Sequence, residues 1–370
     1  MKEMHGLIFA YDASMRLREL TEKRAVSSIP FGGRYRVIDF MLSNMVNAGI
    51  TDVGVIMREN YQSLLDHLGA GKDWDLSRKR GGLRMLPPFG FAGVRGSSYR
   101  GKMEALQNVA DYINRIRQDH VVLACSDLVA NLPLEDIYDH HLNSKCDITA
   151  VCGQKPVGAP ENETFLVTGR KERVVDVIIG RAELGALETL GVYIISRKLL
   201  ESLVSYCAAH NLHDFERDVL QAMVDRLTIG TYLFGGYAAK VSSTSTYFAR
   251  SMDLLRQEVR ADLFLRDRPV KTKVRDEAST YYGPGSVIKN CLVADGCYVE
   301  GEVENCILFR GVRIEKGASV RNSIIMQDTH ICTDAVLNFA ITDKDVKVNP
   351  GRMLMGHGNY PIAISKGSAV

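Results

Sequence analysis

The chain has 370 residues, of which 46% are hydrophobic and 24% charged, and its 46 Lys and Arg residues nearly balance 44 Asp and Glu. This length is sufficient for two domains with sizeable cores. The charge balance argues against a surface devoted to nucleic acid, and no apolar run reaches the roughly 18 residues of a membrane span. No signal peptide precedes the first apolar run, so we expect a cytoplasmic chain that binds neither nucleic acid nor membrane.

The eight cysteines are spread along the chain, and none forms a C-x-x-C pair. Metal sites and disulfide frameworks are usually recognised by clustered cysteines at short spacings. The scattered spacing therefore predicts reduced thiols and no zinc site.

Short apolar runs alternate with amphipathic segments over the first two thirds of the chain. This pattern predicts a mostly parallel sheet with helices on both faces. Ligands of such sheets bind beyond the carboxyl ends of the strands, which brings the tips 10–16 and 124–128 to one candidate site. The expected strands are 7–10, 52–57, 120–127, 147–153 and 190–196, and the expected helices are 35–49, 60–68, 103–118 and 197–210.

Segment 242–267 is predicted to form one helix with a Ser/Thr cap, which leads out of the first domain. The sequence pattern changes after Pro269. An Asn-led motif then recurs as "NCLV", "NCIL", "NSII" and "NFAI", at Asn290, Asn305, Asn322 and Asn338. The intervals of 15, 17 and 16 residues indicate stacked coils.

Aliphatic residues recur at every sixth position within this repeat. One inward side chain per six residues, with three faces per coil, is typical of a triangular left-handed parallel β-helix. The alternative is a set of antiparallel strands with coincidental spacing. We expect domains at 1–241 and 281–370, connected by 242–280, and about four coils with an inward set that includes Val287, Val293, Val299, Leu308, Ile314 and Val320.

The loop after the first strand reads Tyr11-Asp12-Ala13-Ser14. A loop that cradles a triphosphate needs glycines, because its backbone N–H groups must approach the phosphates without a Cβ in the way. Tyr11 and Asp12 put bulk and negative charge in that path, although Arg16 remains as a residue that pairs with phosphate. This loop is therefore a poor triphosphate cradle.

The motifs of the whole chain resemble those of bacterial ADP-glucose pyrophosphorylases (glucose-1-phosphate adenylyltransferases). "MRLRELTEKRA" and "FGGRYRVIDFMLSN" resemble the N-terminal signature of that family, and "YRG", "VVLACSD", "LHDFERDVL" and "GYAAKVSSTSTYFARSMDLL" follow in the family's order. The resemblance implies a Rossmann-like, GT-A-like nucleotidyltransferase domain followed by a short left-handed β-helix. Tyr99, Arg100 and Gly101 would lie at the substrate site.

Several positions depart from the family's catalytic pattern. The glycine loop is lost at Tyr11, Asp12 and Ser14, and the family's phosphate-proximal Lys is Val26. Of the family's two magnesium-binding Asp residues, one maps onto Asp127 and the other onto Lys240. The resemblance thus implies that no catalytic set is intact, with Arg16 and Asp127 as remnants, and that this chain holds no metal.

These departures resemble the GlgD-type branch of the family, which is regarded as regulatory or non-catalytic. That resemblance implies that the chain assembles with a catalytic GlgC-type subunit, which carries the Mg²⁺. The expected assembly is a hetero-oligomer, a tetramer, and the isolated chain would form a homo-oligomer. The chain itself would need no cofactor. It would modulate the conversion of ATP and glucose 1-phosphate to ADP-glucose and diphosphate in glycogen biosynthesis.

The family's effector segment is also N-terminal, and its basic positions map onto Lys23, Arg24 and Arg36. Clustered Arg and Lys suit a phosphorylated small-molecule effector, whereas a merely solvated basic face is the alternative. In the β-helix, where relatives carry basic residues before V-I-D, this chain has "VLNFAITD" at 336–343, which puts the effector in doubt.

Two other functions stay open. Lys240 could supply part of the missing metal charge and still attract a nucleotide or sugar phosphate, leaving a weakly active nucleotidyltransferase. A hexapeptide β-helix can also belong to an acyltransferase, whose chemistry needs a His between neighbouring coils. Only His330 and His357 lie in that region.

Overall fold

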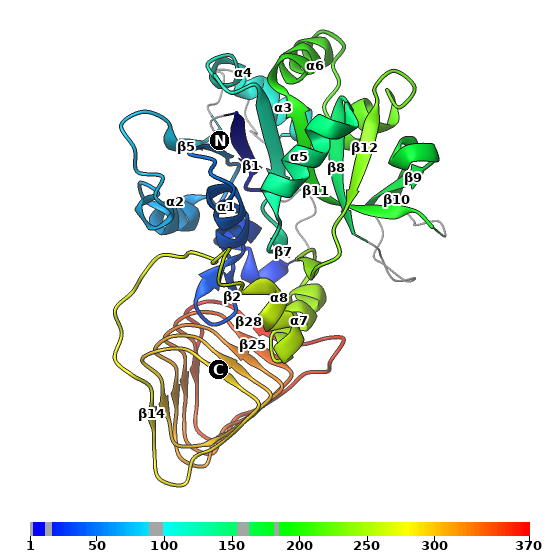
Figure 1. Cartoon of the computed structure of the whole chain (residues 1–370). Helices are drawn as coiled ribbons and strands as arrows, with labels where there is room; N and C mark the ends of the chain where they lie inside the picture. The colour runs from blue at the N-terminus through cyan, green and yellow to red at the C-terminus, as the bar shows by residue number, and fades with distance from the viewer. Residues whose placement is uncertain (1–2, 12–16, 89–98, 154–162, 181–184) are drawn as a thin grey trace.

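The computed structural model describes residues 3–11, 17–88, 99–153, 163–180 and 185–370. An α/β domain forms the N-terminal part, and a triangular coil of strands forms the C-terminal part (Figure 1). Within the described residues, no helix is both long and apolar enough to cross a bilayer.

The central sheet of the α/β domain is mixed, so the prediction of a mostly parallel sheet is wrong. β1, β4, β5 and β6 pair in parallel, but β11 runs antiparallel to three of its neighbours. Among the described residues no α-helix lies between β9 and β10, and these two directly connected strands also pair antiparallel. The strand order is β10-β9-β11-β6-β1-β4-β5, with β8 pairing β11 and β12. The strands are β1 (Met4–Phe9), β4 (Asp52–Ile56), β5 (Gly82–Leu86), β6 (His120–Cys125), β8 (Ile148–Gly153), β9 (Glu163–Thr168), β10 (Val174–Gly180), β11 (Leu187–Ser196) and β12 (Ile229–Leu233).

One short ladder and one hairpin complete the described part of the domain. β7 (Leu128–Ala130) pairs antiparallel with β13 (Ala238–Lys240), and β2 (Pro30–Phe31) pairs with β3 (Tyr35–Arg36). The β7–β13 ladder matters for the site because it places Lys240 beside the end of β6.

The helices bury the apolar stripes that the sequence predicts, but two of them are broken. The stripe of α1 at Ile38, Met41 and Leu42 is fully buried. Segment 103–118 forms two helices because the backbone leaves helical geometry at Val109, and segment 242–267 is interrupted by the extended Arg256. The helices are α1 (Val37–Asn47), α2 (Gln62–Leu68), α3 (Lys102–Asn108), α4 (Ala110–Ile113), α5 (Leu134–Ser144), α6 (Arg197–Ala209), α7 (Thr244–Asp253) and α8 (Gln257–Leu263), and Glu216–Gln221 forms a π-helix.

The C-terminal part is a parallel β-helix with three five-stranded faces, visible as a triangular stack in Figure 1. Parallel register between successive coils excludes the antiparallel alternative, and five strands per face exceed the four coils predicted. The first face comprises β14 (Tyr281–Tyr282), β17 (Tyr298–Val299), β20 (Arg313–Ile314), β23 (His330–Ile331) and β26 (Lys347–Val348). The second comprises β15 (Val287–Lys289), β18 (Glu302–Glu304), β21 (Ser319–Arg321), β24 (Val336–Asn338) and β27 (Met353–Met355), and the third comprises β16 (Leu292–Val293), β19 (Ile307–Leu308), β22 (Ile324–Ile325), β25 (Ala340–Thr342) and β28 (Ile362–Ile364).

The repeated asparagines form a hydrogen-bonded ladder at one corner of the β-helix. Asn290 donates to Asn305 at 2.8 Å, Asn305 to Asn322 at 3.3 Å, and Asn322 to Asn338 at 2.9 Å. The first three have positive φ, which asparagine tolerates better than most residues. The Asn-led repeat is thus explained by a corner that needs both a left-handed backbone and an amide stack.

The predicted inward set is correct except at its first member. Val299, Leu308, Ile314 and Val320 are fully buried in the β-helix core. Val287 is 41% exposed, because it pairs in register with the outward residue of the next coil, and the neighbouring residue in β15 takes the inward place.

The β-helix packs on the α/β domain through its third face. Ile307, Ile324 and Ile341 of successive coils share one apolar cluster with residues of α7 and α8 and with Phe40 of α1. This cluster fixes the segment between β1 and α1 against the β-helix, which sets up the second of the two sites described below.

Candidate functional site

The two predicted strand tips meet at one edge of the sheet. β1 and β6 pair in parallel with Phe9 opposite Cys125, and the Ser126 N–H donates to the Phe9 carbonyl at 3.2 Å. Tyr11 and Asp127 therefore follow neighbouring strand ends. Asp12, Ser14 and Arg16, which the sequence analysis also placed here, lie outside the described residues.

Tyr11 takes up space where the family's glycine loop would turn. Its ring centroid lies 5.7 Å from that of Tyr99 and 6.1 Å from that of Phe9. Its hydroxyl is buried without a hydrogen-bond partner among the described residues, and burial raises the pKa of Tyr11. The first strand thus ends in an aromatic cluster.

A partly buried ion pair lies next to this aromatic cluster. Lys102, at the start of α3, pairs with Glu216 of the π-helix, and the Tyr193 hydroxyl donates to the same carboxylate at 3.2 Å. Burial lowers the pKa of Lys102, but Cys125 and Glu216 beside it raise it more, so the net pKa is well above the ordinary value. The ammonium stays charged and held inside the cleft.

A second lysine lies where the resemblance implies a magnesium ligand. Lys240 ends β13, opposite Leu128 in β7, and the next residue's N–H donates to the Asp127 carbonyl at 2.9 Å. The Lys240 Nζ lies 2.6 Å from Glu163 Oε2 and 3.4 Å from Glu188 Oε1. The three side chains are only 13–16% exposed.

The charges around Lys240 explain how an ammonium is tolerated there. Burial lowers the pKa of Lys240, but its acidic neighbours Glu163, Glu188 and Asp127 raise it more, and the net pKa lies above the ordinary lysine value. The group forms part of the wall of an open pocket that is also lined by Leu190, Phe234 and Arg250. Its positive charge is matched by carboxylates of the chain itself.

This arrangement does not fit a magnesium ion. Mg²⁺ needs oxygen ligands in octahedral geometry, usually from carboxylates, phosphates and water. Here the second carboxylate position presents a cation, and that cation already holds Glu163. The residues at this position therefore do not support a catalytic step through a metal. Val26, at the other departed position, is buried in the apolar cluster at the domain junction.

The three predicted substrate residues have different surroundings. Tyr99 is buried against Tyr11, whereas Arg100 is exposed and its guanidinium pairs with Glu104 at 3.4 Å. Gly101 is required for packing, since a Cβ there would lie 2.4 Å from the carbonyl oxygen of His213. Only Tyr99 of this set faces the cleft cluster described above.

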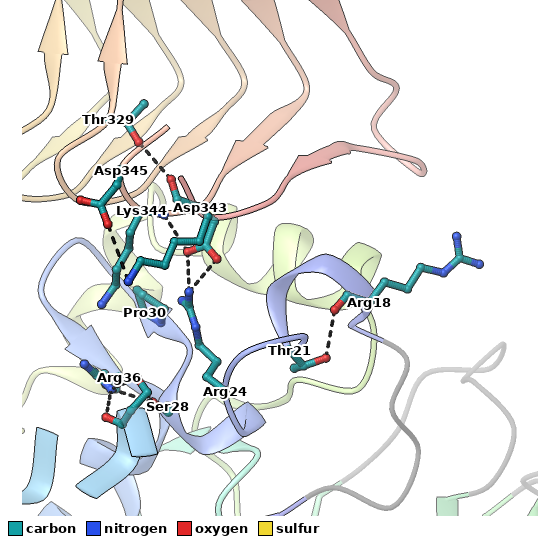
Figure 2. A network of polar contacts seen from close by, with 12 residues as sticks. Arg18, Thr21, Arg24, Ser28, Pro30, Arg36, Thr329, Asp343, Lys344 and Asp345 are labelled. Carbon is teal, nitrogen blue, oxygen red and sulfur yellow. Dashed lines mark hydrogen bonds and ion pairs between the residues drawn. The ribbon is translucent and has the colours of Figure 1, made fainter. Parts of the chain in front are cut away.

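The second site lies at the junction between the α/β domain and the β-helix. The Arg24 Nη2 donates to both carboxylate oxygens of Asp343, at 2.8 and 2.6 Å, and both side chains are buried (Figure 2). The Arg36 Nη1 donates to the Ser28 hydroxyl and the Ser63 carbonyl, each at 2.6 Å. Two of the three predicted effector residues thus come together here.

The third, Lys23, is exposed, and a residue that the sequence analysis missed supplies the further positive charge. Lys344 follows the Asp343 of the ion pair and extends toward Arg24 and Arg36 (Figure 2). Burial lowers the pKa of Lys344 to about 7, with help from the two arginines. Segment 336–343 itself carries no basic residue, but Lys344 follows it directly.

A small pocket lies next to the junction, and its lining reaches the end of the first strand. Its lining includes Tyr11 of the cleft and Arg24 of the junction, together with Thr21, Val26 and Arg58. The Arg24 Nη1 is buried and has no hydrogen-bond partner among the described residues. A buried guanidinium nitrogen without an acceptor is costly, so the junction can gain from a bound anion.

Comparison with known proteins agrees with this architecture. Residues 5–237 match the nucleotidyl transferase family, and residues 274–358 match a GlmU-like C-terminal hexapeptide family. The first match covers the domain that holds the cleft, and the second covers most of the β-helix. The chain therefore belongs to the nucleotidyl transferase family.

Relatives that match over most of their length indicate which branch of this family the chain resembles. The chain is 36% identical to the glycogen biosynthesis protein GlgD of Bacillus subtilis strain 168, over 99% of this chain and 96% of that protein. It is 38% identical to GlgD of Geobacillus stearothermophilus, over 86% and 83%, and 33% identical to the glucose-1-phosphate adenylyltransferase of the same organism, over 86% and 84%. The predicted resemblance to the GlgD-type branch is confirmed.

Proposed function

We propose that this chain is a regulatory, non-catalytic subunit in glycogen biosynthesis, assembling with a catalytic GlgC-type glucose-1-phosphate adenylyltransferase in the cytoplasm. One observation carries the proposal: the Lys240 ammonium lies among Glu163, Glu188 and Asp127 where a catalytic relative needs a magnesium carboxylate. The chain itself needs no cofactor, and Mg²⁺ belongs to the catalytic partner. The assembly is a hetero-oligomer, proposed to be a tetramer.

The expected size of the rate loss favours a cleft without catalytic activity over a weakly active one. Loss of a single preorganised electrostatic donor typically reduces turnover by about 10²–10³. Here the metal carboxylate is replaced, and Tyr11 stands at the end of the first strand. Lys240 is also a poor substitute for the metal's charge, because its ammonium is already paired with carboxylates of the chain.

The junction is the proposed regulatory site. Arg24, Arg36 and Lys344 bring three basic side chains from two domains together, and their mutual repulsion is part of what lowers the pKa of Lys344. A phosphorylated small molecule would relieve that repulsion and accept hydrogen bonds from the guanidinium groups. Such a ligand would bind both domains at once.

The pKa of Lys344 predicts a pH-dependent anion affinity. A bound anion favours the charged lysine, so binding is strongest below about pH 7 and weakens as pH rises through 7, by up to about tenfold per unit. Sulfate is a suitable probe, since it stays a dianion over this range. Calorimetric titrations from pH 6 to 9 should show this slope in the wild type and lose it in Lys344→Met. Equal slopes in both proteins would contradict the assignment.

The function itself is tested by turnover of a catalytic partner. The rate of ADP-glucose formation from ATP, glucose 1-phosphate and Mg²⁺ is measured for the partner alone, for this chain alone and for the mixture. We expect no turnover from the chain alone and a changed rate or substrate dependence in the mixture, together with a mixed oligomer on sizing. Turnover by the chain alone, or an unchanged partner, contradicts the proposal.

A further inference from the structure

Three possible metal ligands converge on the outer side of the first β-helix face. His330 and Cys332 are two residues apart on β23 and its continuation, so their side chains leave the same side of the strand. Glu315 lies beside Cys332 on the preceding coil, since β20 and β23 pair with Arg313 opposite His330. One donor atom from each of the three lies within 4.8 Å of the others.

The separations are close to those that a zinc ion requires. Zn–N, Zn–O and Zn–S bonds of about 2.0–2.3 Å in a tetrahedron place donor atoms roughly 3.3–3.8 Å apart. The His330 Nε2 and Glu315 Oε1 are now 2.6 Å apart and hydrogen-bonded, so they must open by about 1 Å. The side chains of His330 and Glu315 are 36% and 34% exposed, which leaves room for this movement and for entry of an ion.

The charges at the cluster suit a divalent cation. Glu315 accepts a hydrogen bond from the Thr333 N–H at 2.8 Å and contacts His330, which orients its carboxylate toward the cluster. Cys332 supplies a sulfur donor beside this carboxylate. A carboxylate and a thiolate together supply the two negative charges that Zn²⁺ requires.

Two basic side chains flank the cluster and oppose a cation. Arg313 and Lys347 lie in register on either side of His330, on the preceding and following coils. Both are exposed, so water screens their repulsion, while the ligands contact the ion directly. The mixed N, O and S donor set also selects zinc over magnesium or calcium, which take oxygen ligands only.

We infer that Glu315, His330 and Cys332 form a zinc site that connects two neighbouring coils of the β-helix, with water as the fourth ligand. On binding, the Cys332 thiol releases its proton to solvent and a Zn–S bond forms. The His330–Glu315 hydrogen bond opens, His330 carries its proton on Nδ1, and its Nε2 lone pair and a Glu315 oxygen bind the ion. The sequence analysis predicted no zinc site because the ligands lie on different coils and show no short cysteine spacing.

The experiment titrates the full-length, metal-free chain with Zn²⁺ in competition with a chromophoric chelator, and with Co²⁺ to detect a thiolate-to-metal charge-transfer band. We expect one zinc per chain and a cobalt–thiolate band. Cys332→Ser and His330→Ala should each weaken zinc binding by at least about tenfold, and Cys332→Ser should abolish the band. Glu315→Gln should weaken binding without removing the band.

Matched controls lie in the same domain. Cys291→Ser and His357→Ala remove a cysteine and a histidine outside the cluster, and both should keep wild-type zinc affinity and the band. Thermal unfolding without metal identifies any variant that fails to fold. If Cys332→Ser fails to fold, Cys332→Ala replaces it. Zinc binding that survives both Cys332→Ser and His330→Ala, or an absence of stoichiometric binding in the wild type, overturns the proposal. No catalytic partner takes part, so the result is independent of the proposed function.

Discussion

Replacing Lys240 with methionine is expected to destabilise the folded chain by about 3 kcal/mol at neutral pH, because it removes the ammonium from a largely buried group of carboxylates whose mutual repulsion then grows. The substitution would leave Glu163 and Glu188 without the ammonium that lies 2.6 and 3.4 Å from them, and near Asp127. The free energy of unfolding in urea provides the measurement. The loss should shrink in acid, where the carboxylates are protonated and no longer repel one another.

Lys344→Met is the matched control for that variant. Lys344 is also a largely buried lysine, but burial and the neighbouring Arg36 and Arg24 lower its pKa to about 7, so its charge is disfavoured in the folded chain. The same substitution should therefore leave stability unchanged or raise it at pH 6. If the two variants lose equal stability, the cost reflects lost side-chain packing, and the assignment of a compensating cation at Lys240 fails.

Asp343→Ala is expected to have an effect of similar size, about 3–5 kcal/mol, at the junction between the domains. It would leave the Arg24 guanidinium buried without the carboxylate that now accepts two hydrogen bonds at 2.8 and 2.6 Å. Because the pair connects the two domains, the variant should also be cleaved faster by protease in the connection after α8. Unfolding in urea and limited proteolysis are the two measurements.

Two further variants distinguish the loss of the ion pair from a nonspecific loss of stability. Asp345→Asn, two residues away, removes an exposed charge 3.7 Å from Lys366 at a positive-φ position that asparagine tolerates, and it should cost less than about 1 kcal/mol. The double variant Arg24→Met with Asp343→Leu removes both charges and should recover most of the loss. A double variant as unstable as Asp343→Ala would show that the buried guanidinium is not the cause.

Local patterns in the sequence were sufficient for β1, β4, β6, β8 and β11 and for the β-helix, but they missed β5, β9, β10, β12 and α5. The Asn-led repeat works because each coil repeats the same corner and the same inward position, so the pattern is visible without long-range information. Its one wrong inward residue, Val287, lies in an early coil, where the spacing shifts by one position. The strand directions of the sheet were missed, since alternation of apolar runs does not distinguish a hairpin from a crossover.

The parts of the site that could not be predicted all depend on distant residues. The sequence showed that Lys240 replaces a carboxylate, but it did not show Glu163 and Glu188 beside it. Lys344 was missed because its place in the basic cluster depends on its proximity to Arg24, some 320 positions earlier in the chain. Local pattern identifies which residue has changed, whereas the compensating partner is set by tertiary packing.

The Arg24–Asp343 pair also has a consequence for how the chain is made. The two residues are separated by 319 positions, and a ribosome adds about 5–20 residues per second. During translation, on the order of tens of seconds therefore pass between the synthesis of Arg24 and that of Asp343, its ion-pair partner. The nascent α/β domain emerges with a cationic surface still open to water, and it reaches its final form only when the last coils close over that surface.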